Sequence, residues 1–301
     1  MIFSQTYDII RPEFRDLIHS NMGLARLSSG HRWTEGPVWF PAHNLLLFSD
    51  IPHARIYQWT EGGGASVYRQ HSEYSNGNTR DPNGRLVTCH HGSRSVVRTE
   101  HDGTRQVIAE SYMGKRLNSP NDVVVRSDGS IWFTDPTYGI LSDLEGHQAT
   151  PEQEGSFVYR ASPDGQALSA VVTDFVQPNG LAFSVDENRL YIAESGSSHD
   201  PEVPSVLRAF DVDTDGNLSG GQEFATIDNG LPDGLRVDRH DNIWCSAADG
   251  VHVFSKAGDL LGKILVPETV ANLTFGGTRG NMLFITASTS VYSIFVNSAA
   301  A

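Results

Sequence analysis

The sequence predicts an all-β fold, a six-bladed β-propeller around a central tunnel, and three observations support this prediction. Short runs of Val, Ile, Leu, Phe, Tyr and Trp alternate with turns rich in Gly, Asp and Asn, and no long stretch has a helical period. A phrase made of a polar residue and two short strands occurs six times. Its first residues lie 41, 45, 58, 54 and 39 residues apart, close to the spacing of propeller blades, about 40 to 50 residues.

The six phrases begin at polar residues that we call the leading residues. They are Glu35, Asn76, Asn121, Asn179, Asp233 and Asn272. A two-sheet β-sandwich would also contain short strands and turns, but it predicts no register of six equivalent polar positions. The propeller is therefore the better interpretation.

We expect one propeller domain over residues 1–301, in which residues 1–22 form an N-terminal extension. A propeller ring has to close, and residues 23–33 (GLARLSSGHRW) are well placed to supply the outer strand of the last blade. Two polar insertions, 142–155 and 195–205, explain the two longest intervals. Each insertion follows a strand of its blade, so both are expected in loops at the rim of a site.

The charge balance excludes some partners. The 301 residues include 36 acidic and 22 basic side chains, which gives a formal net charge of −14. This charge speaks against binding to nucleic acid or to an anionic membrane, and it is compatible with cation binding. We expect a small-molecule partner, and a chain that is a monomer or a homodimer.

No apolar run in the sequence reaches the roughly 18 residues of a membrane-spanning helix. Asp8, Arg11 and Glu13 interrupt the N-terminal segment where a signal peptide needs an apolar core. We therefore expect a cytoplasmic protein without a signal peptide. Cys89 and Cys245 lie in opposite predicted blades, so no disulfide is expected between them.

The leading residues are expected to face the axis, because equivalent positions on the innermost strands of a propeller converge there. Converging carboxylates and carboxamides are unfavourable unless a cation or ordered water satisfies them. Oxygen ligands suit Ca²⁺ or Mg²⁺, with Mn²⁺ as an alternative, and suit Zn²⁺ less. Glu35 and Asp233 together would balance a divalent cation. The competing interpretation, that the Asn-Gly and Asp-Gly pairs are turns, does not explain their shared register, which favours a metal-binding tunnel.

A second set of polar residues ends the returning strands: Asp50, His90, Asp135 and Glu194. These are candidates for lining a pocket near the axis. Because adjacent strand residues point to opposite faces, one of His90 and His91 is expected to face the tunnel. The string at 211–223 (DVDTDGNLSGGQE) has the spacing of an EF-hand loop, but its twelfth position is Gln222 and its flanks look like strands, so a hairpin turn is expected.

Several strings resemble the gluconolactonase, senescence-marker-protein (regucalcin) and luciferin-regenerating-enzyme family, in its bacterial gluconolactonase-like branch. They are RWTEGPVW (32–39), NGNTRDPNGRLVTCHHGSRSVVRTEHDG (76–103), GKRLNSPNDVVVRSDGSIWFTDPTYGI (114–140), QPNGLAFS (177–184) and LPDGLRVD (231–238). The strings follow the family's order, and the resemblance covers residues 24–290.

The resemblance implies a six-bladed propeller whose tunnel holds one divalent cation, which we expect to be Ca²⁺, with Zn²⁺, Mn²⁺ and Mg²⁺ as alternatives. The metal ligands implied by the motifs are Glu35, Asn121, Asn179 and Asp233. Substrate contacts are expected from Asn121, Asn118, Arg116 and His91. The animal branch has an arginine for substrate binding where this chain has Ser119, so the substrate pocket is expected to differ.

The implied activity is metal-dependent hydrolysis that opens sugar lactones such as gluconolactone to the aldonic acid. A cation near the lactone carbonyl stabilises the negative charge that develops when water attacks. Asp233 is the leading candidate for the catalytic base, with His91 and Asp135 as secondary candidates. Two other functions stay open, namely phosphotriester or aryl-ester hydrolysis at the same metal, and ligand binding by a propeller in which calcium is structural.

Overall fold

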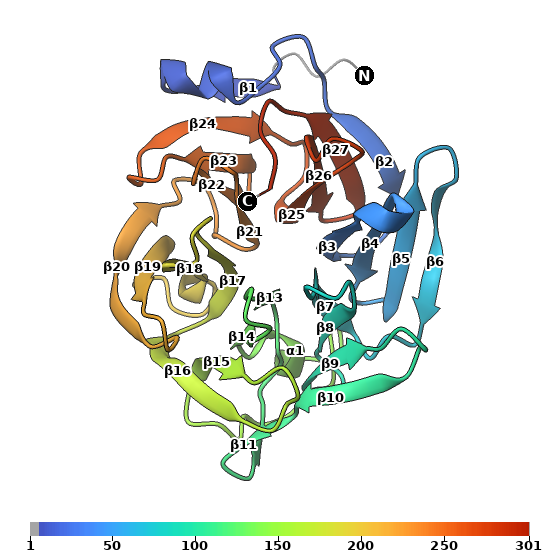
Figure 1. Ribbon diagram of the computed structural model, residues 1–301, viewed down its shortest axis with the longest axis vertical. Coiled ribbons are helices and arrows are strands. Elements are labelled where there is room, and N and C mark those ends of the chain that lie inside the picture. Colours follow the sequence, from blue (N-terminus) through green and yellow to red (C-terminus); the bar gives the residue numbers. More distant parts are fainter. Residues whose placement is uncertain (1–5, 301) are drawn as a thin grey trace.

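Six antiparallel sheets lie around a central axis in the computed structural model, which describes residues 6–300 (Figure 1). The predicted six-bladed propeller is therefore confirmed. In the first five blades the four blade strands follow one another in the chain, and the strand nearest the axis comes first. The first three blades consist of β3 (Thr34–Phe40), β4 (Leu45–Asp50), β5 (Arg55–Thr60) and β6 (Gly64–Gln70); β7 (Ser75–Arg80), β8 (Leu86–His90), β9 (Ser95–Thr99) and β10 (Arg105–Ala109); and β13 (Val123–Val125), β14 (Ile131–Asp135), β15 (Ser156–Ala161) and β16 (Leu168–Phe175).

The other three blades are also given from the axis outwards, and the outermost strand of the sixth blade, β2, comes from the N-terminal part of the described chain. They consist of β17 (Pro178–Phe183), β18 (Arg189–Glu194), β19 (Val206–Val212) and β20 (Leu218–Thr226); β21 (Leu235–Val237), β22 (Ile243–Ala247), β23 (Gly250–Phe254) and β24 (Leu260–Leu265); and β25 (Val270–Gly276), β26 (Met282–Ala287), β27 (Ser290–Phe295) and β2 (Ala25–Ser29). The remaining elements are β1 (Tyr7–Ile9), the hairpin of β11 (Ser111–Tyr112) and β12 (Lys115–Arg116), the short helix α1 (Tyr138–Leu141) and 3₁₀ turns at Pro12–Asp16, Pro41–His43 and Gly196–Ser198.

The second strand of each blade is almost fully buried, because neighbouring blades cover both of its faces. Every residue of β8, β14 and β22 is buried. Runs such as Ile131–Asp135 (IWFTD) therefore need no alternation of polar and apolar residues. The outermost strand of the first blade, β6, is instead exposed at six of its seven residues.

The hydrophobic core of the described residues is divided into six clusters, one between each pair of neighbouring blades. Between the fifth and sixth blades, for example, Trp244 and Val251 pack in one cluster with Leu273 and Ile285. No blade is buried by its own side chains alone, so the closed ring is needed to complete every cluster.

The ring closes between segments from opposite ends of the chain. Strand β2 pairs antiparallel with β27, with Ala25 opposite Ser293, and becomes the outer strand of the sixth blade. Of the predicted N-terminal extension, residues 1–5 lie outside the described residues. The rest folds against the fifth blade, where β1 adds a further strand beside β24 and Phe14 is fully buried in the cluster shared with the sixth blade (Figure 1). None of the helices within residues 6–300 has the length and apolarity needed to cross a bilayer.

Two smaller predictions are confirmed. Cys89 and Cys245 are free, and each is buried in a cluster between blades. The EF-hand-like string lies in the hairpin between β19 and β20, where Asp213 Oδ1 accepts hydrogen bonds from the backbone N–H groups of Asp215 and Asn217. These hydrogen bonds close a tight turn and leave no helix on either side.

The leading residues lie in or next to the innermost strands, so the interpretation of their Asn-Gly and Asp-Gly pairs as hairpin turns is wrong. The glycine in these pairs links blades through its backbone. Gly77 N donates to Asn121 O at 2.8 Å, and Gly180 N donates to Asp233 O at 3.0 Å. The same hydrogen bond, 2.8 Å, runs from Gly234 N to Ala271 O, not to Asn272.

This pattern corrects the predicted register of the last blade. The sixth leading position is Ala271, and Asn272 lies one residue further, at the position that glycine occupies after Glu35, Asn76, Asn179 and Asp233. Comparison of the repeats by residue type placed the polar Asn272 at the leading position, whereas the hydrogen bonds between blades place Ala271 there. Five oxygen-bearing leading residues therefore converge on the axis, not six.

Because the innermost strands approach one another closely, we expect a single methyl group added at one of their glycines to lower the stability of the fold strongly. In Gly180→Ala the new Cβ would lie 2.2 Å from Asp233 O and 2.8 Å from Gly234 Cα, so the backbone would have to move. We expect the free energy of unfolding, measured by urea denaturation, to fall by about 3 kcal/mol. Gly23→Ala is the control, because nothing lies within 4 Å of the added Cβ there. Equal stability of the two variants would contradict the proposed packing at the axis.

Candidate functional site

A cavity of about 390 Å³ lies at one end of the axis, and all six blades contribute to its wall. It is lined by Trp33, Glu35, Ile51, Asn76, Asn121, Tyr138, Glu145, Asn179, Ser195, Gly230, Leu231, Pro232, Asp233, Ala248, Thr269 and Val270. The first five leading residues are therefore brought together, including the four predicted metal ligands. A larger cavity of about 720 Å³ between the first and sixth blades is lined by Trp39, Trp59 and Phe284 and contains none of the leading residues.

The cavity concentrates negative charge. Burial, followed by the charge of nearby Asp122, raises the pKa of Glu35 to about 8. Burial also raises the pKa of Asp233, and the charges of Glu35 and Asp122 raise it further. The charge of Arg236 lowers the pKa of Glu35 and of Asp122, but its Nη1 is 3.8 Å from the Asp122 carboxylate and it does not line the cavity.

Two buried carboxamide oxygens in the cavity wall have no hydrogen-bond partner, Asn76 Oδ1 and Asn179 Oδ1. A buried acceptor without a partner is unfavourable, and a cation would satisfy it. Glu35 and Asp233 add carboxylate oxygens at the same cavity, and neither sulfur nor imidazole is among the lining residues. This donor set fits a divalent cation that prefers oxygen ligands, such as Ca²⁺ or Mg²⁺.

His91 supports the cavity from behind its wall. Its Nε2 lies 3.1 Å from Asn76 Nδ2, and its Nδ1 lies 3.0 Å from Glu145 O. Burial lowers the pKa of His91 to about 4, so the ring is neutral near pH 7. A neutral ring accepts from Asn76 through Nε2 and donates to Glu145 through Nδ1, which turns Asn76 Oδ1 away from the histidine. His91 therefore orients cavity residues and does not itself line the cavity.

The other two predicted substrate contacts also lie outside the cavity wall. Asn118 is fully buried and its Nδ2 donates to Asp135 O at 3.1 Å and to Gly155 O at 3.0 Å. Arg116 lies on the exposed strand β12 and donates from Nη2 to Ser93 O at 3.1 Å. Of the four residues expected to contact substrate, the structure brings only Asn121 to the cavity.

The residues that end the returning strands have a structural role. Asp135 Oδ2 accepts from Asn118 N at 2.8 Å, and Glu194 Oε2 accepts from Val176 N at 2.9 Å. Asp50 accepts an equivalent hydrogen bond from the backbone in the first blade. Each carboxylate fixes the loop that leads into the innermost strand of its own blade. The expectation that this set lines the pocket is wrong for all four members, Asp50, His90, Asp135 and Glu194.

Glu145 and Tyr138 line the cavity but were not predicted from the sequence. Glu145 belongs to the insertion at 142–155, and Tyr138 begins α1 just before it. The Tyr138 hydroxyl lies 2.9 Å from Ser198 Oγ in the second insertion, so the two insertions meet at the rim. The length of the insertions indicated that they lie at the rim of the site. It could not indicate which of their residues line the cavity, because an insertion has no counterpart in the other repeats.

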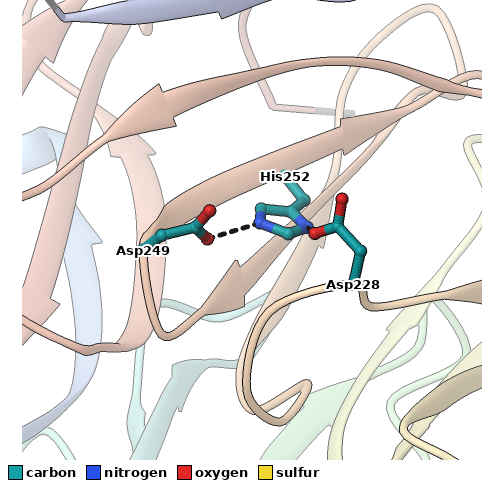
Figure 2. A group of neighbouring side chains, drawn as sticks. All are labelled: Asp228, Asp249 and His252. Carbon is teal, nitrogen blue, oxygen red and sulfur yellow. Dashed lines mark hydrogen bonds and ion pairs between the residues drawn. The ribbon is translucent and has the colours of Figure 1, made fainter.

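A second acidic group outside the tunnel contains Asp228, Asp249 and His252 (Figure 2). His252 Nε2 lies 2.6 Å from Asp249 Oδ1. Lys263 Nζ donates to Asp228 at 2.6 Å and to Asp249 at 3.1 Å, so an ammonium group already occupies one oxygen of each carboxylate and offsets part of their negative charge. The group ties the loop after β20 to the fifth blade, and the leading residues make the better metal centre.

Comparison with known proteins gives concordant matches. A family model described as SMP-30/Gluconolactonase/LRE-like region matches residues 33–289. The chain is 33% identical to a gluconolactonase of Zymomonas mobilis, over 94% of this chain and 84% of that protein. It is 29% identical to a pentonolactonase of Haloferax volcanii, over 85% of this chain and 82% of that protein. A solved gluconolactonase from Xanthomonas campestris superimposes with a TM-score of 0.90 and 37% identity, over 97% of this chain and 95% of that chain.

The structural role of Asp135 predicts a pH dependence of stability. Burial raises its pKa to about 7, although backbone N–H groups of Asn118 and Ser119 act in the opposite direction. Between about pH 4 and pH 7 the folded chain holds a proton that the unfolded chain has released, so stability falls as the pH rises, by up to about 1.4 kcal/mol per pH unit.

Asp135→Asn should make this slope shallower by up to about 1.4 kcal/mol per pH unit in urea denaturation measured between pH 4.5 and 7.5 in EDTA, while the contributions of Glu35 and Asp233, whose pKa values burial also raises, remain. Asp102→Asn, at an exposed turn, should leave the slope in place. A slope unchanged in Asp135→Asn would mean that this carboxyl group is ionised over the whole range.

Proposed function

The chain belongs to the SMP-30/gluconolactonase/LRE-like family, and from this premise we propose that it opens sugar lactones such as gluconolactone to the aldonic acid with the help of one divalent cation. It is a lactonase, an ester hydrolase of the kind found among its relatives in Zymomonas mobilis and Haloferax volcanii. We propose Ca²⁺ as the cation, held by Glu35, Asn121, Asn179 and Asp233.

One observation carries the proposal. Two carboxylates, Glu35 and Asp233, and an unpartnered carboxamide oxygen, Asn179 Oδ1, meet in one cavity whose described wall contains neither lysine nor arginine. Negative charge gathered without a protein cation needs a charge from elsewhere. When bound, a divalent cation would supply it and would stabilise the negative charge that develops on a lactone carbonyl oxygen.

Asp233 is the proposed base. Its carboxylate faces the cavity, and the side chain of Asn179 hydrogen bonds to it. It accepts a proton from the attacking water as the new C–O bond forms, and the proton passes to the ring oxygen when the ester C–O bond breaks. His91 and Asp135, the secondary candidates, are less suited, because neither lines the cavity. Both ring nitrogens of His91 are engaged with Asn76 and Glu145, and Asp135 Oδ2 accepts from the Asn118 backbone.

The rest of the cavity suits a small, polar ring. Trp33, Ile51 and Leu231 offer apolar surface, while Glu145 and Tyr138 offer groups that hydrogen bond to hydroxyls. The remaining expectations from the sequence are retained as part of the proposal, namely a cytoplasmic location, a monomer or homodimer, and no nucleic-acid or membrane partner.

Replacing Asp233 tests whether it acts as the catalytic base or only as a metal ligand. Asp233→Asn keeps an oxygen ligand but loses the charge and the proton acceptor. We expect Ca²⁺ to bind more weakly, and kcat for gluconolactone with saturating Ca²⁺ to fall about 100-fold. The enzyme is first stripped with EDTA and then reconstituted with Ca²⁺, Mg²⁺, Mn²⁺ or Zn²⁺. Asp259→Asn, at an exposed carboxylate of the same blade, is the matched control.

The outcomes of this experiment distinguish the alternatives. Wild-type turnover by Asp233→Asn with Ca²⁺ saturated would refute Asp233 as the base. Faster turnover of paraoxon or phenyl acetate than of any aldonolactone would favour an esterase or phosphotriesterase at the same site. If no substrate is hydrolysed although Ca²⁺ raises the melting temperature, the propeller is a binding protein with structural calcium.

The charge of the cavity predicts discrimination between lactones. When a bound divalent cation keeps all three groups ionised, Glu35, Glu145 and Asp233 carry one negative charge more than the cation neutralises. We therefore expect kcat/KM for the 6-phosphate ester of gluconolactone to be at least about tenfold lower than for gluconolactone itself, mainly through KM. Glu145→Gln should narrow this difference. Equal kcat/KM values for the two substrates would contradict a net negative cavity.

A further inference from the structure

A second tier of the tunnel lies one residue beyond the leading residues. In four blades this position is glycine, because a Cβ on Gly36 or Gly77, for example, would lie 2.1 or 2.4 Å from a backbone oxygen of the next blade. The third and sixth blades, which lie opposite each other in the ring, carry Asp122 and Asn272 at this position (Figure 1). Both side chains are only 1% exposed.

These two side chains meet at the axis. Asn272 Nδ2 donates to Asp122 Oδ2 at 3.3 Å and to Glu35 Oε2 at 3.1 Å. Their other oxygens are held by the backbone, since Asn272 Oδ1 accepts from Leu273 N at 2.8 Å and Asp122 Oδ1 accepts from Val123 N at 2.9 Å. Each side chain is thus anchored to its own strand and presents one remaining polar atom to the axis.

The contact orients the carboxylate of Glu35. Oε2 accepts two hydrogen bonds, from Gly36 N at 2.5 Å and from Asn272 Nδ2 at 3.1 Å. Oε1 takes part in neither, and Glu35 lines the cavity. An aspartate at position 272 would place a third carboxylate against Glu35 and Asp122, whereas the amide adds a donor and no charge.

We propose that Asn272 is a positioning residue for the metal centre. Asn272 holds Glu35 through one carboxylate oxygen, Oε2, and leaves the other oxygen, Oε1, free to bind the cation. This inference rests on the proposed function, in which Glu35 is a ligand. Asn272 does not line the cavity, so it acts through Glu35. Arg236 Nη1, 3.8 Å from Asp122 Oδ2, supplies a positive charge to the tier. Groups that orient a ligand in this way commonly change metal affinity by about 10- to 100-fold when they are removed.

A double-mutant cycle tests the proposal. Ca²⁺ binding to the EDTA-stripped full chain is measured by calorimetry for the wild type, Asn272→Ala, Glu35→Gln and the double variant. We expect Asn272→Ala to weaken Ca²⁺ binding about tenfold in the wild-type background. In the Glu35→Gln background the same change should weaken binding by less than about twofold, because the ligand that Asn272 positions has lost its charge.

Two further variants control for folding. Asn242→Ala removes a carboxamide that donates to the Asp238 carboxylate at 3.0 Å in a turn of the fifth blade, and it should leave Ca²⁺ affinity unchanged. Asn272→Ser, which keeps a hydroxyl for the Leu273 N–H, replaces Asn272→Ala if the latter does not fold. Asn272→Ser should also weaken Ca²⁺ binding when Glu35 is present, and it should have little effect in the Glu35→Gln background.

Equal weakening in both backgrounds would overturn the proposal, because Asn272 would then act independently of Glu35. Unchanged affinity in both Asn272 variants would overturn it as well. If Glu35→Gln binds Ca²⁺ as the wild type does, the proposed metal centre itself fails and the inference fails with it. That result is recognised from the Glu35→Gln measurement alone.

Discussion

The approach of six innermost strands to one axis is the constraint on which the rest of the structure depends. Backbone hydrogen bonds such as Gly180 N to Asp233 O join consecutive blades there, and they leave no space for a side chain at most second-tier positions. The leading side chains are carried to the same place by the same geometry. Carboxylates that would avoid one another in water are thereby held in one buried cavity, and the propeller scaffold maintains this arrangement.

The leading residues form the upper tier of the tunnel, and the residues that follow them form the lower tier. The two tiers differ in how their negative charge is balanced. In the upper tier, no lysine or arginine lines the cavity beside Glu35 and Asp233, so these carboxylates are suited to an external cation. In the lower tier, Asp122 has Arg236 within 3.8 Å and an amide donor from Asn272. Asn272 Nδ2 donates to both Glu35 and Asp122 and so connects the two tiers through one side-chain atom. The lower tier therefore supports the upper one without competing for its ligand.

The repeat period was sufficient to predict the blades, because each blade repeats the same apolar second strand. The shared register was also sufficient for Glu35, Asn76, Asn121, Asn179 and Asp233. It failed in the sixth blade, since residue type alone cannot tell a leading position from the position after it. The register also gave a wrong prediction for Asp50 and Glu194. A carboxylate at the end of a strand can accept a hydrogen bond from a loop N–H instead of lining a cavity, and residue type does not distinguish the two roles. Glu145 lies in an insertion, where no repeat exists to compare.

The pairing of β2 with β27 has a consequence for synthesis. Strand β2 leaves the ribosome before every other strand of the six blades, yet Ala25 has no partner in its own sheet until Ser293 has been made. Until then this segment has unpaired backbone groups, and the core cluster between the first and sixth blades is missing one side. The interface between the first and last blades therefore forms late, and folding of the complete ring depends on a contact between residues that are far apart in the chain.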